Sequence, residues 1–483
     1  MDESHVSDSE EDYGTVEANS GERHDRFSEL PDSLILTIIS LLDMRNVVRT
    51  SLLSKRWKNI WSTIPCLDFI DFEQTPSIIS SVLSQWKGPK ILKFRLSFPN
   101  FIVGPSSVMD SLLHFAIEKQ VAELFLYFYF WECVNSNGKD IYCLPQPLYS
   151  CSSITKLTLE VCELRIEGNV QWHQLKILKL VYVDGLSGDA MNQILLGAPL
   201  LEVLVLESFE IGENENFNIR STSLKMLKIH TDYICPETTV LRIWAPNLLT
   251  LNISACFYGT CLLDVPSLTD AILCLGHYGD VATQFEMFNH VFRSIRHVEK
   301  VTLSHWCIEM LVQLKTKYMV MPLSNSKILE LYYVNAKDIL DLVEMMFPKL
   351  ERLIVDQGDQ GFDGTYGEEV HIAMVDACNS LASAKMTFPS PSLLRLKTFE
   401  ATWSISKPSI IPVIQVLLES APVLEKMVLR LRQDASYPKT FILAQEKVLS
   451  MPRSSPTAQV IITDDFGITD KSSSTCSCSS CNY

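Results

Sequence analysis

The sequence has few basic residues and no long apolar run. Its 41 lysines and arginines are outnumbered by 57 aspartates and glutamates, which gives a formal net charge of −16. Because phosphate neutralisation requires a basic surface, this balance argues against a general nucleic-acid-binding protein. The most hydrophobic run, 124–131, is too short to cross a bilayer and is predicted to be a strand buried on both faces. No N-terminal segment resembles a signal peptide, so we expect a soluble protein without membrane contact in a reducing compartment, cytoplasmic and/or nuclear.

The sequence also lacks any residue pattern typical of an enzyme. Its 10 histidines occur singly, with no H-E-x-x-H or paired-ligand spacing. His230, His277 and His305 are better explained as solvated or core residues than as catalytic ones. The glycine-rich segment 358–367 lacks the lysine of a phosphate loop, and its acids are misplaced for a calcium loop, which favours a surface insertion. We therefore expect no catalytic residue, no metal and no cofactor.

Cysteine is frequent but shows no metal-binding or disulfide framework. Of the 14 cysteines, 11 are scattered through the apolar body, where free buried thiols are expected. The closest two of these, Cys256 and Cys261, lack metal-ligand spacing. The other three, Cys476, Cys478 and Cys481, lie in the segment 464–483 without a fourth zinc ligand, so a disordered tail is the simpler interpretation.

The segment 25–72 predicts three short helices. The first is indicated by apolar residues at helical spacing: Leu30, Leu34, Ile35, Ile38, Ile39, Leu41 and Leu42. Asn46 is expected to cap the second helix, and Ser54 is expected to open a third in which Trp57 and Trp61 share a face. So small a unit has more apolar residues than its own core can use. The surplus must cover either the rest of the chain or another protein.

A second pattern, apolar-x-x-apolar-x-apolar, recurs along the remaining chain. Its clear copies are Ile154/Leu157/Leu159, Leu175/Leu178/Leu180, Leu201/Leu204/Leu206, Leu224/Leu227/Ile229 and Leu248/Leu251/Ile253. Successive middle positions are about 21 to 26 residues apart, which is the spacing of leucine-rich repeats. Proline precedes many copies and follows helical segments such as 191–197, 339–347 and 411–420. The pattern predicts an α/β solenoid with a parallel sheet on one face and helices on the other.

Several sequence strings resemble a known family. Leu30-Pro31, Leu34, the segment 38–42 and the segment 47–57 with Trp61 resemble an F-box, although the turn 43–46 lacks the proline usual in relatives. The chain is most similar to the plant proteins that combine an F-box, leucine-rich repeats and a C-terminal FBD domain. The phrases PSLLRLKTFEATW and IPVIQVLLESAPVLEKMVLRL, together with the following residues to about 462, resemble the FBD domain. The repeat pattern alone also allows this segment to be an end cap of the solenoid.

The resemblance implies a set of domains and partners. The expected organisation is an acidic disordered tail (1–24), an F-box (25–73), a repeat solenoid (74–389), an FBD-like cap (390–463) and a disordered tail (464–483). The F-box is expected to dock the Skp adaptor of a cullin-based ubiquitin ligase through Leu30, Pro31, Leu34, Ile38, Val48, Ser54 and Trp57. Alternatively, some of these residues fill the core of the helical unit. A basic group without nearby acids could steer the acidic adaptor: Arg45, Arg49, Lys55, Arg56 and Lys58.

The predicted function is recruitment of a target protein for ubiquitination by a subunit without catalytic activity. Residues flanking the strand leucines are predicted to line the inner face of the solenoid and contact the target: Lys156, Thr158, Lys179, Val205, Lys228, His230, Asn252, Thr302 and Ser304. Two other hypotheses remain. One is a repeat scaffold without a ligase role, and the other is a helix-turn-helix-like DNA-binding module, whose third helix offers few residues for reading bases.

Overall fold

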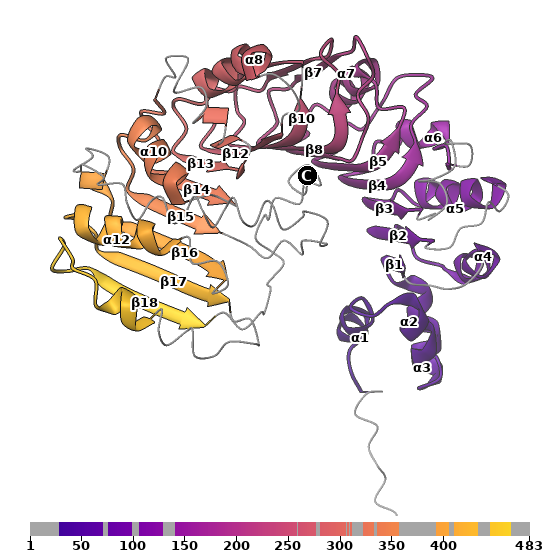
Figure 1. Cartoon of the computed structure of the whole chain (residues 1–483). Coiled ribbons are helices and arrows are strands. Elements are labelled where there is room, and N and C mark those ends of the chain that lie inside the picture. Colours follow the sequence, from indigo (N-terminus) through magenta and orange to yellow (C-terminus); the bar gives the residue numbers. More distant parts are fainter. Residues whose placement is uncertain are drawn as a thin grey trace, which may run out of the picture.

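The chain folds into an arch whose inner surface is a long β-sheet (Figure 1). The computed structural model describes residues 29–70, 76–98, 106–128, 141–257, 259–276, 281–305, 307–308, 310–311, 322–332, 336–356, 393–404, 410–432 and 445–464. Three short helices stand at one end of the arch, and further helices lie along its outer side. The predicted α/β solenoid with an N-terminal helical unit is confirmed.

The helical unit consists of α1 (Asp32–Ile39), α2 (Met44–Thr50) and α3 (Lys55–Ile60), followed by the 3₁₀ turn η1 (Trp61–Thr63). Ser54 caps α3 as predicted, because its hydroxyl accepts the backbone N–H of Trp57. The predicted cap of α2 was wrong. Asp43 is the cap, and its carboxylate accepts the backbone N–H of Asn46 (2.9 Å) and its side-chain amide (2.8 Å). The helix therefore starts three residues earlier, where a negative charge also favours its N-terminus.

The helical unit is joined to the solenoid without a linker. Strand β1 (Cys66–Phe69) begins three residues after η1. The indole of Trp86, just past α4 (Pro76–Gln85), donates to the carbonyl of Ile64 (2.8 Å), and the backbone N–H of Lys87 donates to that of Ser62 (2.6 Å). One continuous cluster of buried apolar residues runs from Ile35 in α1 to Ala458 near the last strand. The unit and the repeats thus share a single core.

The main sheet is parallel throughout. In spatial order its fifteen described strands are β1, β2 (Lys93–Ser97), β3 (Glu123–Tyr127), β4 (Lys156–Glu163), β5 (Ile177–Asp184), β6 (Val203–Glu207), β8 (Met226–Cys235), β10 (Thr250–Phe257), β12 (Asp270–Gly276), β13 (Lys300–Leu303), β14 (Ile328–Tyr332), β15 (Arg352–Asp356), β16 (Thr398–Ser404), β17 (Lys426–Arg432) and β18 (Gln459–Asp464). The middle leucines of the predicted repeat are direct partners across it: Leu157, Leu178, Leu204, Leu227 and Leu251. The repeat register is confirmed.

Strands β12 and β14 lack the full leucine pattern. In β12 the middle position is Ala271, which pairs with Leu251 and Val301. Before β14 the first apolar position is occupied by Ser326, which is buried because its hydroxyl donates to the carbonyl of Val298 (2.7 Å). A small residue and a hydrogen-bonded serine thus replace leucine without breaking the stack.

Prolines mark the turns that lead into the strands. After α7 (Gly188–Gly197), the backbone N–H of Leu201 donates to the carbonyl of Ala198 (3.1 Å), which encloses Pro199 in a turn. The same bond closes the turns at Pro348 and Pro422, after α10 (Ala336–Met346) and α12 (Ile411–Ser420). Proline has no N–H to continue a helix, and its fixed φ suits the second position of such a turn. Each proline therefore ends a helix and starts a turn.

The outer layer is not helical throughout. Helices α5 (Ser106–Glu118), α6 (Gln146–Tyr149), α7, α8 (Val281–Ser294), α10 and α12 cover it as predicted. Between α7 and α8, however, a second parallel sheet takes their place, formed by β7 (Asn216–Arg220), β9 (Val240–Trp244) and β11 (Thr260–Asp264). Buried residues alternate there, as in Phe217 and Ile219 of β7. A period of two fits a strand and excludes a helix.

Strand β3 corrects the prediction for the run 124–131. Leu124 and Leu126 are buried, but the alternating Phe125 and Tyr127 are only half-buried, because their side of the sheet is the inner surface of the arch. Residues 129–131 lie outside the described residues. One face of this strand, not both, belongs to the core.

The described part of the segment 390–463 continues the same sheet. β16, α12 and β17 repeat the strand–helix–strand arrangement of the other units, and β18 pairs in parallel with β17. This agrees with the end-cap interpretation, while the domain boundaries stay predictions. Among the described residues, no helix has both the length and the apolar character needed to span a membrane.

Adjacent leucines after Pro199 test the shared core. Leu201 is fully buried, whereas Leu200 is 52 % exposed. We expect Leu201→Ala to lower the free energy of unfolding by about 2–5 kcal/mol, because the cavity lies inside a close-packed ladder. Leu200→Ala is the matched control and should change it by less than about 1 kcal/mol. Urea unfolding followed by circular dichroism measures both, and equal losses would contradict the assigned core.

Candidate functional site

The helical unit exposes a group of large apolar side chains. On α1, Ile35 and Ile39 point into the core, which leaves the neighbouring row outside. Six large apolar side chains of the unit are exposed, and we call them the apolar patch: Leu34, Ile38, Leu41, Leu42, Leu52 and Leu53. Leu41 and Leu52 are 83 % and 86 % exposed. They are a third of the 18 exposed large apolar side chains in the described chain, yet they fall between positions 34 and 53. Such a concentration marks an interaction surface.

The predicted adaptor contacts divide between this surface and the core. Pro31, Leu34 and Ile38 are exposed, and Leu30, Val48 and Ser54 are half-buried. Trp57 is only 3 % exposed, so it fills the core of the unit and presents no surface to a partner. Its indole N–H has no hydrogen-bond partner in the described part of the chain. The contact residues themselves stay predictions.

Sequence reasoning did not assign four members of the patch as contacts. Leu41 and Leu42 continue the outward row of α1 beyond its last turn, and Leu52 and Leu53 follow α2. The helical spacing from Leu34 could have extended the prediction to Leu41 and Leu42. The exposure of Leu52 and Leu53 depends on α2 ending at Thr50, which the sequence pattern did not predict.

The basic group near the patch is partly neutralised. Arg56 in α3 donates its Nε–H to Asp32 at the start of α1 (2.9 Å) and so links two helices of the unit. Arg49 is exposed, and Arg45 is half-buried. The side chains of Lys55 and Lys58 lie outside the described residues. Arg49 is therefore the described cation best placed to attract an acidic partner.

The inner face brings most of the predicted target residues into one row. Thr158, Lys179, Val205, Lys228 and Asn252 are successive partners across β4, β5, β6, β8 and β10. Thr302 lies in the same row two strands further on, after Ile272. Lys156 begins β4, while His230 and Ser304 lie in the parallel row nearer the carboxyl ends of the strands.

The predicted target residues differ in how far they are buried. Thr158, His230, Thr302 and Ser304 are buried, so a target could not reach them in this conformation. Lys156 is exposed, and the remaining ones are half-buried: Lys179, Val205, Lys228 and Asn252. Of the nine predicted target residues, these five therefore present accessible side chains.

The two central lysines are already paired within the chain. Lys179 on β5 lies between Glu160 (Nζ to Oε1, 3.6 Å) and Glu207 (Nζ to Oε2, 3.4 Å), and Lys228 contacts Glu207 at 2.7 Å. Burial opposes ionisation of Glu207, but its hydrogen bond with Lys228 and the charges of both lysines hold its pKa below the ordinary value. These lysines thus stabilise the sheet as well as line its inner face.

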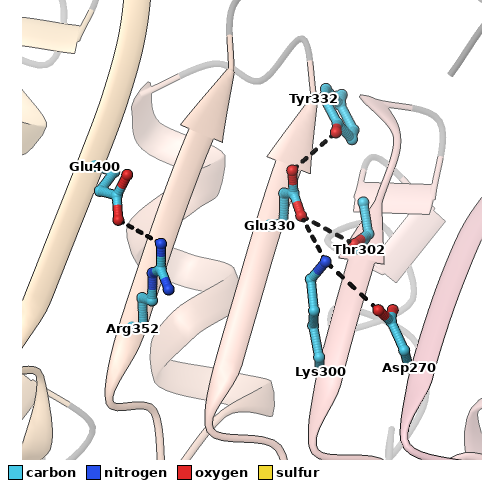
Figure 2. A network of polar contacts seen from close by, with 7 residues as sticks. All are labelled: Asp270, Lys300, Thr302, Glu330, Tyr332, Arg352 and Glu400. Carbon is cyan, nitrogen blue, oxygen red and sulfur yellow. Dashed lines mark hydrogen bonds and ion pairs between the residues drawn. The ribbon is translucent and has the colours of Figure 1, made fainter. Parts of the chain in front are cut away.

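A second polar network, shown in Figure 2, lies further along the arch. Lys300 on β13 lies between Asp270 (3.5 Å) and Glu330 (3.2 Å), and we call these three residues the acidic cluster. The hydroxyls of Tyr332 (2.8 Å) and Thr302 (3.4 Å) donate to Glu330. Burial alone would lower the pKa of Lys300, but the two carboxylates raise it above its ordinary value. Of this cluster and its two hydroxyl donors, sequence reasoning had named only Thr302.

The arginine cluster follows on the next strands. Glu400 on β16 accepts a hydrogen bond from Arg352 on β15 (2.5 Å) and two from Arg430 on β17 (3.2 Å each). In the chain, Arg352 and Glu400 are 48 residues apart, and Glu400 and Arg430 are 30 residues apart. Sequence reasoning missed them because only the register of the strands makes them neighbours.

The described residues contain no group of three or more histidine, cysteine, aspartate or glutamate side chains placed to hold a metal ion. Of the eight cysteines whose side chains the structure describes, six are buried. Burial raises the pKa of Cys162 far above its ordinary value, which makes its thiol unreactive. His277, the glycine-rich segment 358–367 and the three tail cysteines lie outside the described residues.

Comparisons with known proteins agree with this arrangement. Residues 27–69 match the model of the F-box domain, and residues 109–305 match a model described as "FBD-associated F-box protein At5g56370, LRR repeats". The F-box/LRR-repeat protein At3g26922 of Arabidopsis thaliana is 31% identical over 264 residues, 53% of this chain and 83% of that protein. The F-box/FBD/LRR-repeat protein At3g52680 of the same plant is 29% identical over 348 residues, 70% of this chain and 72% of that protein.

The pairing of Glu207 with Lys228 predicts a pH dependence. Because the folded-state pKa of Glu207 is lowered, the pair stabilises the fold above the ordinary glutamate pKa of 4.5, and this stabilisation is lost as the pH falls through the folded value. In a double-mutant cycle of Glu207→Gln and Lys228→Met, urea unfolding should give a coupling of about 1 kcal/mol at neutral pH.

The coupling should disappear in acid, once Glu207 is protonated. The control cycle is Glu202→Gln with Lys225→Met, a pair at 2.9 Å that is more exposed. Its coupling should be smaller at neutral pH because water and salt screen it. A Glu207–Lys228 coupling that persists unchanged in acid would contradict the assigned ion pair.

Proposed function

The chain belongs to the F-box/LRR-repeat protein family, and on this premise we propose that it is the substrate-recruiting subunit of a Skp–cullin–F-box ubiquitin ligase. In this proposal the helical unit docks the Skp adaptor and, through it, cullin. The inner face of the solenoid holds a target protein, and the complex acts in the cytoplasm and/or the nucleus. The F-box by itself implies binding of a Skp adaptor in general, and the cullin and the target are inferred from the family role.

The observation that carries the proposal is the apolar patch of the helical unit. The core of the unit uses Ile35, Ile39 and Trp57, while the patch faces solvent. Isolated exposed leucines need no explanation, but six within one small helical unit do. An adaptor that covers the patch removes this apolar area from water, and the exposed Arg49 beside it favours an acidic partner.

The proposed mechanism is proximity. A ligase subunit that holds target and adaptor together raises the effective concentration of the target near the ubiquitin-carrying enzyme. The joint between helical unit and solenoid suits this role, because Trp86 and Lys87 tie the first repeat to η1 by hydrogen bonds without a linker. The chain itself then needs no catalytic residue, as is general for F-box/LRR-repeat adaptors.

Charged substitutions in the patch test the proposal. We expect Leu34→Asp with Ile38→Asp to weaken binding of a purified Skp adaptor by at least about 100-fold, because two carboxylates would be desolvated at the interface. Both side chains are exposed, so the fold should survive. Isothermal titration calorimetry measures the affinity, and circular dichroism checks the fold.

The matched control places the same charges on another exposed apolar pair. Leu196→Asp with Leu200→Asp changes the end of α7 and the turn after it, and adaptor affinity should not change. Equal binding by the patch variant and the wild type would overturn the assignment of the patch. A folded wild type that binds no adaptor would favour the alternative function, a repeat scaffold without a ligase role.

A further inference from the structure

The inner face of β10 to β17 carries two clusters of opposite net charge. The acidic cluster has two carboxylates for one ammonium group, a net charge of −1, and the arginine cluster has two guanidinium groups for one carboxylate, a net charge of +1. Figure 2 shows Arg352 and Glu400 of the arginine cluster on the strands next to the acidic cluster. Neither cluster is neutral within itself, and each would need one further charge of opposite sign to become neutral.

The acidic end also has two hydrogen-bond acceptors without donors. The side-chain oxygens Oδ1 of Asn252 and Oδ1 of Asp270 are buried and have no hydrogen-bond partner in the described chain. Their strands, β10 and β12, are neighbours, and Asn252 is paired with the residue two positions after Asp270, so both lie on the same face. A buried acceptor without a donor costs free energy. Both atoms are enclosed in this conformation, so a donor from another molecule removes this cost only once neighbouring side chains have moved aside.

Burial of Asp270 also favours a cation at the acidic cluster. It raises the pKa of Asp270 above the ordinary carboxylate value, even though Lys300 acts in the opposite direction. The single ammonium of Lys300 is shared with Glu330 and so does not balance both acids. A lysine or arginine side chain supplies both the positive charge and the missing N–H donors.

The arginine cluster favours an anion instead. The side chains of Arg352 and Arg430 are 45 % and 42 % exposed, and they share one carboxylate, that of Glu400. Each guanidinium carries five N–H donors, and the described contacts of the pair with Glu400 use few of them. The planar fork of arginine matches a carboxylate, which can accept two of these bonds at once.

The spacing of the strands fixes the distance between the two ends. Asp270 on β12 and Arg352 on β15 are three strands apart, and Arg430 on β17 is two strands further. At about 4.8 Å per strand this is about 14–24 Å, the length of about four to seven residues of extended chain. Ile328 and Ile354 lie between the ends on β14 and β15 and are half-buried, which favours small apolar residues in the middle.

We propose that this part of the inner face binds an extended segment of the target protein with one basic and one acidic residue about five residues apart. The basic side chain lies against Asn252 and Asp270, and the acidic side chain lies against Arg352 and Arg430. This inference rests on the proposed function, because it names the chemistry of the target that the solenoid recruits.

Short synthetic peptides of defined charge test the proposal with the full-length protein. One peptide pair carries a lysine and a glutamate about five residues apart, in both orders, within a serine, glycine and alanine background. Peptides with two lysines or two glutamates at the same positions are the comparison. By fluorescence anisotropy, at least one mixed peptide should bind about tenfold more tightly than either uniform peptide. Equal affinities, or no binding of any peptide, would overturn the proposal.

A charge reversal should change the preference in a defined direction. In Arg352→Glu with Arg430→Glu, both ends are acidic, so the two-lysine peptide should become the best ligand. If this variant does not fold, Arg352→Gln with Arg430→Gln should remove the discrimination between glutamate and serine at the acidic position. The control, Lys176→Glu with Lys225→Glu, reverses two exposed charges next to β5 and β8, at least five strands from Arg352, and should keep the wild-type preference. An unchanged preference in the folded arginine variants would overturn the assignment.

Asn252 separates a binding role from a structural one. In the free protein its oxygen is buried without a donor, so Asn252→Leu should leave the thermal midpoint unchanged or raise it. The same variant should bind the mixed peptide about three- to tenfold more weakly. A lower midpoint with unchanged peptide affinity would show that the side chain stabilises the fold, and it would overturn the site at this end.

Adaptor binding to the same preparations separates this inference from the proposed function. If the adaptor binds and the peptides show no charge preference, the inference fails while the ligase role stands. If the peptides show the preference and the adaptor does not bind, the ligase role fails and the peptide-binding surface stands.

Discussion

The fold depends on the parallel pairing of short strands whose leucines share one core. No single unit can bury its own leucines, so each strand is stable only between two neighbours. Leu178, for example, is fully buried because Leu157 and Leu204 flank it in register. The helical unit enters the same stack through Trp86 and Ile64, and the last strands continue it. Substitution at any rung therefore affects a structure that connects both proposed binding surfaces.

The same register determines the chemistry of the inner face. Equivalent positions of adjacent strands lie about 4.8 Å apart, so like charges there repel unless a charge of opposite sign separates them. Lys179 lies on the strand between those of Glu160 and Glu207, and Glu400 lies between the strands of Arg352 and Arg430. This alternation places each charge next to a charge of opposite sign on the neighbouring strand. It still leaves a net charge on individual clusters. Clusters with residual charge can discriminate between target proteins.

Sequence alone predicts the regular part of this structure well. The five clear repeats are in register, and the helices that precede Pro199, Pro348 and Pro422 are present because helix spacing and proline are local signals. The positions that the sequence did not predict depend on tertiary context. Ala271 and Ser326 occupy leucine positions that only the neighbouring strands reveal, and the cap of α2 is set by Asp43 accepting from Asn46.

The candidate site divides in the same way. Leu34 and Ile38 are predictable from the helical period, whereas the burial of Trp57 depends on how three helices pack. Arg352, Glu400 and Arg430 meet only after the solenoid has formed, because no spacing in the chain links them. Patterns of local period are thus visible in one sequence, and contacts between strands become visible once the register is known.

The most direct test of the account is a comparison of ubiquitinated proteins in plant cells that express either the wild-type chain or the Leu34→Asp, Ile38→Asp variant. Quantitative mass spectrometry of ubiquitin remnants would follow both lines at equal expression of the chain. The account predicts a defined set of proteins whose ubiquitination rises with the wild type and not with the variant. Identical remnant profiles in the two lines, with the wild-type chain folded, would contradict a role in recruiting targets to a ubiquitin ligase.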